Sequence, residues 1–296
     1  MNFDTIADLP RCHKKKITSP QDDRVIVRTA LGNRRRSSED IAADMTAAGV
    51  QVSARTIRRR LCAIGLKAHI PRKKPFLNPA QRKKRVNWCK EHLNWSEDDW
   101  GKVLFSDESK ISLFGSDGVC YVRRRVGEAY LPECMLPTMK HPVSVMVWAC
   151  MASKGVGRMK IMKGNVTARV YIDEVLASKV KQSAVDIFGD RSDFIFQQDG
   201  APCHTAKICQ AWFKDNNVRL LDWPGNSPDL NPIKNLWARL KKLVAQRRPS
   251  NKTELIEAIV ASWHHVITVQ ELSGLVNSMP RRCMAVIAAK GYPTKY

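Results

Sequence analysis

The residues best placed to do chemistry are Asp199 and Lys234. Asp199 ends a run that begins with the apolar residues 194–196, and this run predicts a buried strand that delivers a carboxylate at its C-terminal edge. Lys234 follows Asn231 and Pro232, which predict a helix start with Asn231 as the N-cap and Lys234 at the third helical position. The positive end of the helix dipole favours an acid at that position, so a lysine there suggests that an acid has been replaced.

Two adjacent acids, Asp107 and Glu108, follow the sequence Val-Leu-Phe-Ser at 103–106. Side chains alternate across a strand, so Val103, Phe105 and Asp107 share one face. Leu104, Ser106 and Glu108 share the other. Only one of the two adjacent acids can therefore face a given site.

Two blocks of the sequence closely resemble the Tc/mariner superfamily of cut-and-paste DNA transposases: Gln-Asp-Gly-Ala-Pro-Cys-His at 198–204 and Asn-Ser-Pro-Asp-Leu-Asn-Pro-Ile-Lys-Asn-Leu-Trp at 226–237. The resemblance extends from about Lys14 to Tyr296. It implies a ribonuclease-H-like fold with an Asp-Asp-Glu triad, whose last two acids are separated by 34 residues in the commonest branch. Here 34 residues separate Asp199 from Lys234, so Lys234 stands where the family has Glu. The motif Phe-Ser-Asp-Glu-Ser implies Asp107 as the first acid.

The resemblance implies that Asp107 and Asp199 hold two Mg²⁺ ions for phosphodiester cleavage and strand transfer. Lysine in place of Glu changes the charge of the three catalytic positions from −3 to −1 and adds an ammonium that repels metal. We predict a transposase-like DNA-binding chain with an inactivated site. The alternative left open is a competent Mg²⁺-dependent transposase in which an acid such as Asp229 substitutes. Cys203 and His204 are expected to give packing and polar support.

The charge of the chain is unevenly distributed. The net charge is +22, and residues 11–90 hold 22 Lys and Arg against five Asp and Glu. A polyphosphate partner explains this asymmetry, and we expect that partner to be double-stranded DNA. Nine cysteines without a C-x-x-C pair give neither a zinc nor a disulfide framework. No signal peptide is visible, and the longest apolar run, 143–152, is too short to span a bilayer.

Residues 19–70 are predicted to form a small all-α helix-turn-helix domain. Capped helices are expected from Ser19-Pro20 to about 31, over 39–48 and over 54–64. Their expected inward residues are Val25, Ile26, Ala30, Leu31, Ile41, Ala42, Met45, Ile57, Leu61 and Ile64. The expected DNA-contacting residues of the third helix are Arg55, Arg58, Arg59 and Arg60.

Two basic segments flank this domain. Residues 1–18, with Lys14, Lys15 and Lys16, match the family's basic linker in degraded form, and the family's first helical module is expected to be absent. Residues 71–100 are predicted to be a basic connector, with Arg72, Lys73 and Lys74 as DNA contacts. Its runs 71–75 and 82–85 are a nuclear address, a phosphate-contacting linker or a solvated helix face. We expect a nuclear protein.

Residues 101–296 are predicted to be the ribonuclease-H-like domain, an α/β fold with a mixed sheet flanked by helices. Expected strands cover 103–107, 110–114, 119–122, 143–149, 194–199 and 218–221. Expected helices cover 167–187, 204–215, 232–245, 252–266 and 268–290. The loop 124–142 resembles a region with which relatives clasp a second subunit and DNA, so a homodimer on DNA is expected.

Overall fold

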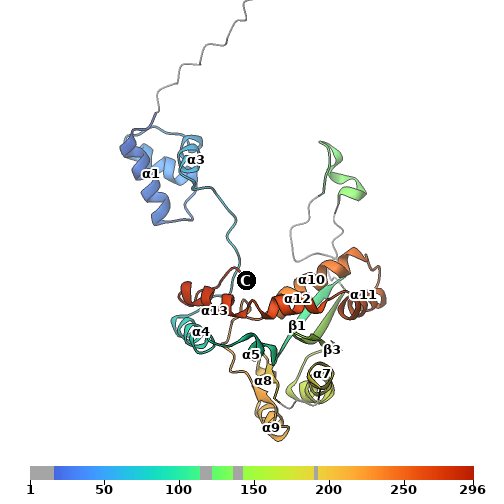
Figure 1. Cartoon of the computed structure of the whole chain (residues 1–296). Helices are drawn as coiled ribbons and strands as arrows, with labels where there is room; N and C mark the ends of the chain where they lie inside the picture. Colours follow the sequence, from blue (N-terminus) through green and yellow to red (C-terminus); the bar gives the residue numbers. More distant parts are fainter. Residues whose placement is uncertain (1–16, 114–121, 136–142, 190–192) are drawn as a thin grey trace, which may run out of the picture. The chain divides into compact units, whose positions relative to one another are not determined.

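The computed structural model describes residues 17–113, 122–135, 143–189 and 193–296 (Figure 1). The chain divides into two compact units, Met1–Lys73 and Lys74–Tyr296, which are described separately. Several sequence expectations lie outside the described residues. They are Lys14, Lys15 and Lys16 of the basic linker, the turn expected at 116–118 and nearly all of the strand expected at 119–122.

The first unit is a three-helix bundle, as predicted. Its helices are α1 (Pro20–Gly32), α2 (Ser38–Ala47) and α3 (Ala54–Ala63). Ser19, Ser37 and Ser53 cap them, each side chain accepting a hydrogen bond from the backbone N–H three residues on. The buried core comprises Ile26, Ile41, Ala42, Met45 and Ile57. Three residues expected inside, Val25, Leu31 and Ile64, are exposed, because a short three-helix unit covers only a narrow stripe of each helix.

The second unit is built on a mixed five-stranded sheet in the order β3-β2-β1-β4-β5. Its strands are β1 (Val103–Ser112), β2 (Ser144–Ala152), β3 (Gly155–Met162), β4 (Ile195–Gln197) and β5 (Arg219–Leu220). Strands β1, β2 and β3 pair antiparallel, whereas β4 and β5 run parallel to β1. The predicted mixed sheet is confirmed, and β1 lies at its centre.

Two strand predictions were wrong. The expected strands 103–107 and 110–114 are one continuous strand, because β2 pairs with β1 from Phe105 to Ser112 without a break. Strand β3 was missed, since its glycines and its charged Arg158 and Lys160 disguise the alternation. Both cations face acids of the next helical segment, Arg158 with Asp186 and Lys160 with Glu174.

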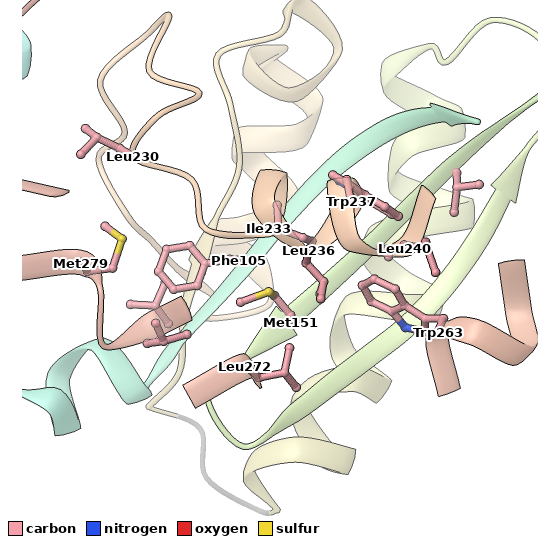
Figure 2. Close-up of a cluster of buried hydrophobic side chains, with 14 of the residues drawn as sticks. Phe105, Met151, Leu230, Ile233, Leu236, Trp237, Leu240, Trp263, Leu272 and Met279 are labelled. Atoms are coloured by element: carbon pink, nitrogen blue, oxygen red, sulfur yellow. The ribbon is translucent and has the colours of Figure 1, made fainter. Parts of the chain in front are cut away.

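One face of the sheet carries the first hydrophobic cluster, which includes Phe105 and Met151, and six of the described helices contribute residues to it. They are α4 (Pro79–Glu91), α5 (Glu97–Gly101), α10 (Ile233–Gln246), α11 (Lys252–His265), α12 (Val269–Val276) and α13 (Met279–Ala288). Figure 2 shows Ile233, Leu236, Trp237 and Leu240 of α10 directed at this cluster. The buried residues of α10 are Ile233, Leu236, Trp237, Leu240 and Val244.

The other sheet face is covered by a second cluster, around Leu104, Trp148 and Phe196. Its helices are α6 (Ala168–Val170), a π-helical stretch (Tyr171–Val180), α7 (Lys181–Phe188), α8 (Pro202–Thr205) and α9 (Lys207–Asp215). The helix predicted at 204–215 is broken at Ala206, which has an extended backbone. Phe105 belongs to the first cluster and Leu104 to the second, so neighbouring residues of β1 point to opposite faces of the sheet, as predicted.

The predicted boundaries change at two places. Residues 74–100 were expected to be a connector but belong to the second unit, because α4 packs on α13. The single helix expected at 268–290 is two helices, since Pro280 starts a new helix one turn after α12 ends. Short 3₁₀ turns, Glu128–Tyr130 and Pro132–Cys134, occupy part of the predicted loop.

Among the described residues, no helix is both long enough and apolar enough to cross a membrane. The cysteines among the described residues are free.

Candidate active site

Asp107 and Asp199 lie on neighbouring strands at corresponding positions. Phe105 pairs with Gln197 across the parallel β1–β4 ladder, and each Asp follows its strand residue by two. Hydrogen bonds from Ser106 fasten the strands here, since its hydroxyl donates to the Gln197 carbonyl oxygen at 2.7 Å. Asp199 lies just beyond the end of β4, as predicted. Asp107 does not end its strand, because β1 continues to Ser112 along β2.

The start of α10 faces Asp107. Asn231 links the two elements, since its side-chain nitrogen donates to the Ser106 carbonyl oxygen and its oxygen accepts from the Ile233 backbone N–H. The helix itself begins at Ile233, with Pro232 at the N-cap. Lys234 is therefore the second helical residue and not the third, and its backbone N–H bonds to the Asn231 carbonyl oxygen.

Lys234 forms an ion pair with Asp107. Its ammonium nitrogen lies 2.7 Å from the Asp107 Oδ1, and Trp237 Nε1 donates to the other carboxylate oxygen at 3.0 Å. Lys234 and Trp237 are three residues apart on α10, so their side chains share one helix face. Burial raises the pKa of Asp107 to about 6, and Lys234 acts in the opposite direction. Both oxygens of this carboxylate are thus occupied by protein donors.

Asp199 is held by a different cation, His204 of α8. Its Oδ1 lies 2.7 Å from the imidazole Nδ1 and accepts from the Ala201 backbone N–H. The other ring nitrogen of His204 lies 3.4 Å from Glu108. Burial opposes the imidazolium, but the two carboxylates raise the pKa of His204 to about 10, so the ring is charged at neutral pH.

The five side chains of this site, Asp107, Glu108, Asp199, His204 and Lys234, already pair with one another. Three carboxylates against two cations leave a local charge of −1, and Asp107 and Asp199 already accept hydrogen bonds from Lys234 and His204. Two metal ions about 4 Å apart need several free oxygen ligands. No cluster of three or more His, Cys, Asp or Glu side chains suited to a metal ion exists in the described residues.

Asp229, the substitute acid left open by the sequence, is not available as a ligand. Arg85 donates to both of its carboxylate oxygens, at 2.8 and 2.7 Å. The backbone N–H and the hydroxyl of Thr294 also donate to it. The side chains of Arg85 and Asp229 are 1% and 3% exposed, so this pair is enclosed in the protein.

Comparison with known proteins places the chain in a family. A transposase profile matches residues 23–94, and a DDE superfamily endonuclease profile matches residues 102–256. The chain is 41% identical over 276 residues to the transposable element Tcb1 transposase of Caenorhabditis briggsae and to the Tc1 transposase of Caenorhabditis elegans. Each match covers 93% of this chain and all of the relative. The chain belongs to the Tc1/mariner family of transposases.

A solved structure agrees with this fold. The mariner Mos1 paired end complex with Mg is similar at a TM-score of 0.79 and 19% identity, covering 99% of this chain and 85% of that one. A helix-turn-helix domain followed by a ribonuclease-H-like DDE domain, as the sequence predicts, is therefore confirmed.

The basic residues predicted to contact DNA differ in their surroundings. On α3 of this transposase, Arg55, Arg58 and Arg59 are exposed. Arg60 instead donates to Thr18 at 2.8 Å and lies 3.2 Å from Asp23, so it fastens α3 to the start of α1. Arg72, Lys73 and Lys74 are exposed. Lys74 donates to the Tyr296 carbonyl oxygen.

Two site partners were missed from the sequence. Trp237 was assigned only to the apolar face of α10, although its indole N–H needs an acceptor when it is buried. Glu108 lies on the opposite strand face from Asp107, as predicted, yet it reaches the site through His204. The available signal in the sequence was a histidine five residues after Asp199, at 204. Its ring bonds to Asp199 and lies near Glu108, which agrees with the polar support expected of it.

Proposed function

We propose that this Tc1/mariner chain binds double-stranded DNA but does not cut or join it. The observation that carries the proposal is the Lys234–Asp107 ion pair at the position where the family has a third acid. An ammonium beside Asp107 supplies the positive charge that a metal ion would otherwise bring. The pair leaves Asp107 without a free oxygen for a cation.

Electrostatics supports the inactive state. Like charges about 4 Å apart repel by roughly 4 kcal/mol at an effective dielectric constant near 20, and partial exposure of Lys234 reduces this figure. Replacement of an acid by lysine changes two charges at once, so each incoming cation meets one attraction fewer and one repulsion more. We infer that binding of Mg²⁺ is impaired for this reason.

The nuclease assay for this proposal is nicking of supercoiled plasmid in Mg²⁺. The native chain should leave the plasmid intact, and Asp199→Ala should behave identically. Mg²⁺-dependent nicking by the native chain that Asp199→Ala abolishes would overturn the proposal.

Binding to DNA is assigned to the helix-turn-helix unit. The exposed side chains of Arg55, Arg58 and Arg59 on α3 support contact with a major groove and its phosphates. Arg58→Ala together with Arg59→Ala should weaken duplex binding and lower the slope of log K against log salt by about 1–2. An unchanged slope would remove α3 from the interface.

We also propose that two copies assemble on DNA. The segment 122–135 exposes Val126, Tyr130, Leu131 and Met135, an apolar set that a second subunit would cover. Light scattering with and without duplex should show a dimer only in the complex. A complex whose mass corresponds to a single chain would contradict this assembly.

Nuclear localisation is a further proposal. Residues 71–75 are exposed and outside regular secondary structure, as an import signal requires. The second basic run, 82–85, is a poorer candidate because Arg85 is buried. Substitution of Arg72, Lys73 and Lys74 by Ala should redistribute a fluorescent fusion to the cytoplasm, whereas nuclear retention would argue against this address.

A further inference from the structure

Helices α4 and α13 form an antiparallel pair whose basic residues divide into two groups. The pairing is fixed at both ends. A side chain at Gly291 would lie within 3 Å of the Arg82 backbone, and at the other end the free thiols of Cys89 and Cys283 lie within hydrogen-bonding reach of each other. The two ends of the pair therefore bring the N-terminal half of α4 against the residues that follow α13.

The first group of cations makes contacts with other residues of the protein. Arg85 binds Asp229 and the Gly291 carbonyl oxygen. Arg282 donates to the Asp229 carbonyl oxygen and to Asn235. Arg82 lies over the ring of Tyr292, with its guanidinium carbon 4.2 Å from the centroid. These three side chains hold the tail after α13 and the loop before α10.

The second group faces solvent and forms what is here named the α4–α13 surface: Lys83, Lys84, Lys90, Arg281 and Lys290. All five are exposed, and within the described residues none of them makes an ion pair. Helix α13 contains no acid, and Glu91 is the sole acid of α4. Four of these cations lie on the two packed helices, Lys290 follows α13, and with one acid among them they repel one another in the free protein.

We propose that the α4–α13 surface binds the phosphate backbone of duplex DNA, as a contact additional to the helix-turn-helix unit. Salt bridges elsewhere in the second unit show that the fold supplies acids where cations need neutralising, as at Arg158 and Lys160. On the α4–α13 surface, no acid of the described residues forms an ion pair with any of the five cations. Phosphates are the complementary partner, because release of their condensed counterions drives binding by unpaired Lys and Arg. The contact is independent of base sequence, since it reads only the backbone.

The test is salt-dependent binding of the full chain to a duplex of about 30 base pairs, three helical turns, of arbitrary sequence. Lys83→Ala with Lys84→Ala is one variant, and Arg281→Ala with Lys290→Ala is the second. Each should weaken binding several-fold and lower the slope of log K against log salt by about 1–2. Their exposed positions leave the unfolding midpoint unchanged, which is measured in parallel.

The matched control is Lys207→Ala with Lys214→Ala on α9, which removes the same charge from the opposite sheet face. It should leave the salt slope unaltered. The same comparison in the Arg58→Ala, Arg59→Ala background separates this surface from α3. In that background, Lys83→Ala with Lys84→Ala, or Arg281→Ala with Lys290→Ala, should lower the residual binding of DNA further. If both α4–α13 pairs behave like the α9 pair, the inference is wrong, whatever the plasmid assay shows about cleavage.

Discussion

Two buried aspartates of the DDE domain pair with cations at the same 2.7 Å distance, yet their surroundings are opposite. Asp229 meets Arg85, whose side chain is 1% exposed, through two parallel hydrogen bonds, and Thr294 completes the shell. Asp107 meets one nitrogen of Lys234, whose side chain is 43% exposed. The first pair is closed on all sides, whereas the second opens to solvent.

The difference distinguishes an ion pair that the protein encloses from one that solvent reaches. A guanidinium matches a carboxylate in shape and holds both oxygens, whereas an ammonium on a flexible stem is a single point charge. Burial opposes ionisation at Asp229, but hydrogen bonds from Arg85 and Thr294 keep its pKa below the ordinary value. At Asp107 burial prevails and the pKa rises to about 6. An open, poorly matched pair is what the proposed loss of one acid from a metal site would leave.

The largest effect is expected from breaking the closed pair. Arg85→Met leaves the Asp229 carboxylate buried beside Thr294 without its cation, and this should lower the free energy of unfolding by about 3–5 kcal/mol. Denaturant unfolding measures the loss. Lys84→Met, one residue earlier and exposed, should change it by less than about 0.5 kcal/mol. Equal effects of the two substitutions would mean that the closed pair does not stabilise the fold.

The His204–Asp199 pair lies between these extremes, because the ring is buried and Asp199 is half exposed. The pKa of His204 is about 10 in the folded chain against an ordinary 6.5. Its stabilisation is therefore complete below pH 6.5 and is lost as the pH rises to about 10. After allowance for solvent at Asp199, this loss should be on the order of 2 kcal/mol.

His204→Gln tests this pair by removing the titrating ring. The free energy of unfolding should then vary less between pH 6.5 and 10 than in the native chain. His265→Gln, at an exposed position of α11, should keep the native pH profile. A native-like profile in His204→Gln would show that the ring is neutral and does not act as a cation.

The smallest effect is expected from breaking the open pair. Asp107 binds its proton more tightly when folded, so its contribution to stability falls as the pH rises from about 3.8 to about 6. Lys234→Met removes the ammonium that limits this fall. Stability should drop by up to about 1 kcal/mol at pH 8 and stay unchanged at pH 4, where Asp107 is protonated.

A double-mutant cycle isolates the Lys234–Asp107 term. In the Asp107→Asn background, Lys234→Met should have no effect at pH 8, because no carboxylate is left to lose its partner. The same loss with and without Asp107 would assign it to the packing of the lysine stem.

The sequence was sufficient for the elements that repeat a simple pattern. Capped helices such as α3 and α10 follow from serine or proline starts and apolar spacing, and β4 follows from its apolar run. Strand β3 could not be predicted, because the acids that pair with Arg158 and Lys160 come close to them only in the folded chain. The connection of Glu108 with Asp199 escaped as well, since it depends on His204 crossing from one element to another.

Asp229 shows most clearly what could not be predicted from the sequence. Its motif position made it a candidate ligand, and only the burial of Arg85 on α4, 144 residues earlier, shows that its oxygens are occupied. The same holds for Arg60, which the sequence groups with Arg58 and Arg59 but the fold assigns to Thr18. Contacts between distant segments decide which of several like residues is functional.

The central claim, that Lys234 occupies the place of a metal ion, is tested most directly by calorimetric titration of Mg²⁺ into the native chain and into Lys234→Glu. Glutamate returns the three positions to a charge of −3, so Lys234→Glu should give saturable heat that Asp107→Asn abolishes. The native chain should give only the heat of dilution. Saturable binding of Mg²⁺ by the native chain, lost in Asp199→Ala, would contradict the claim.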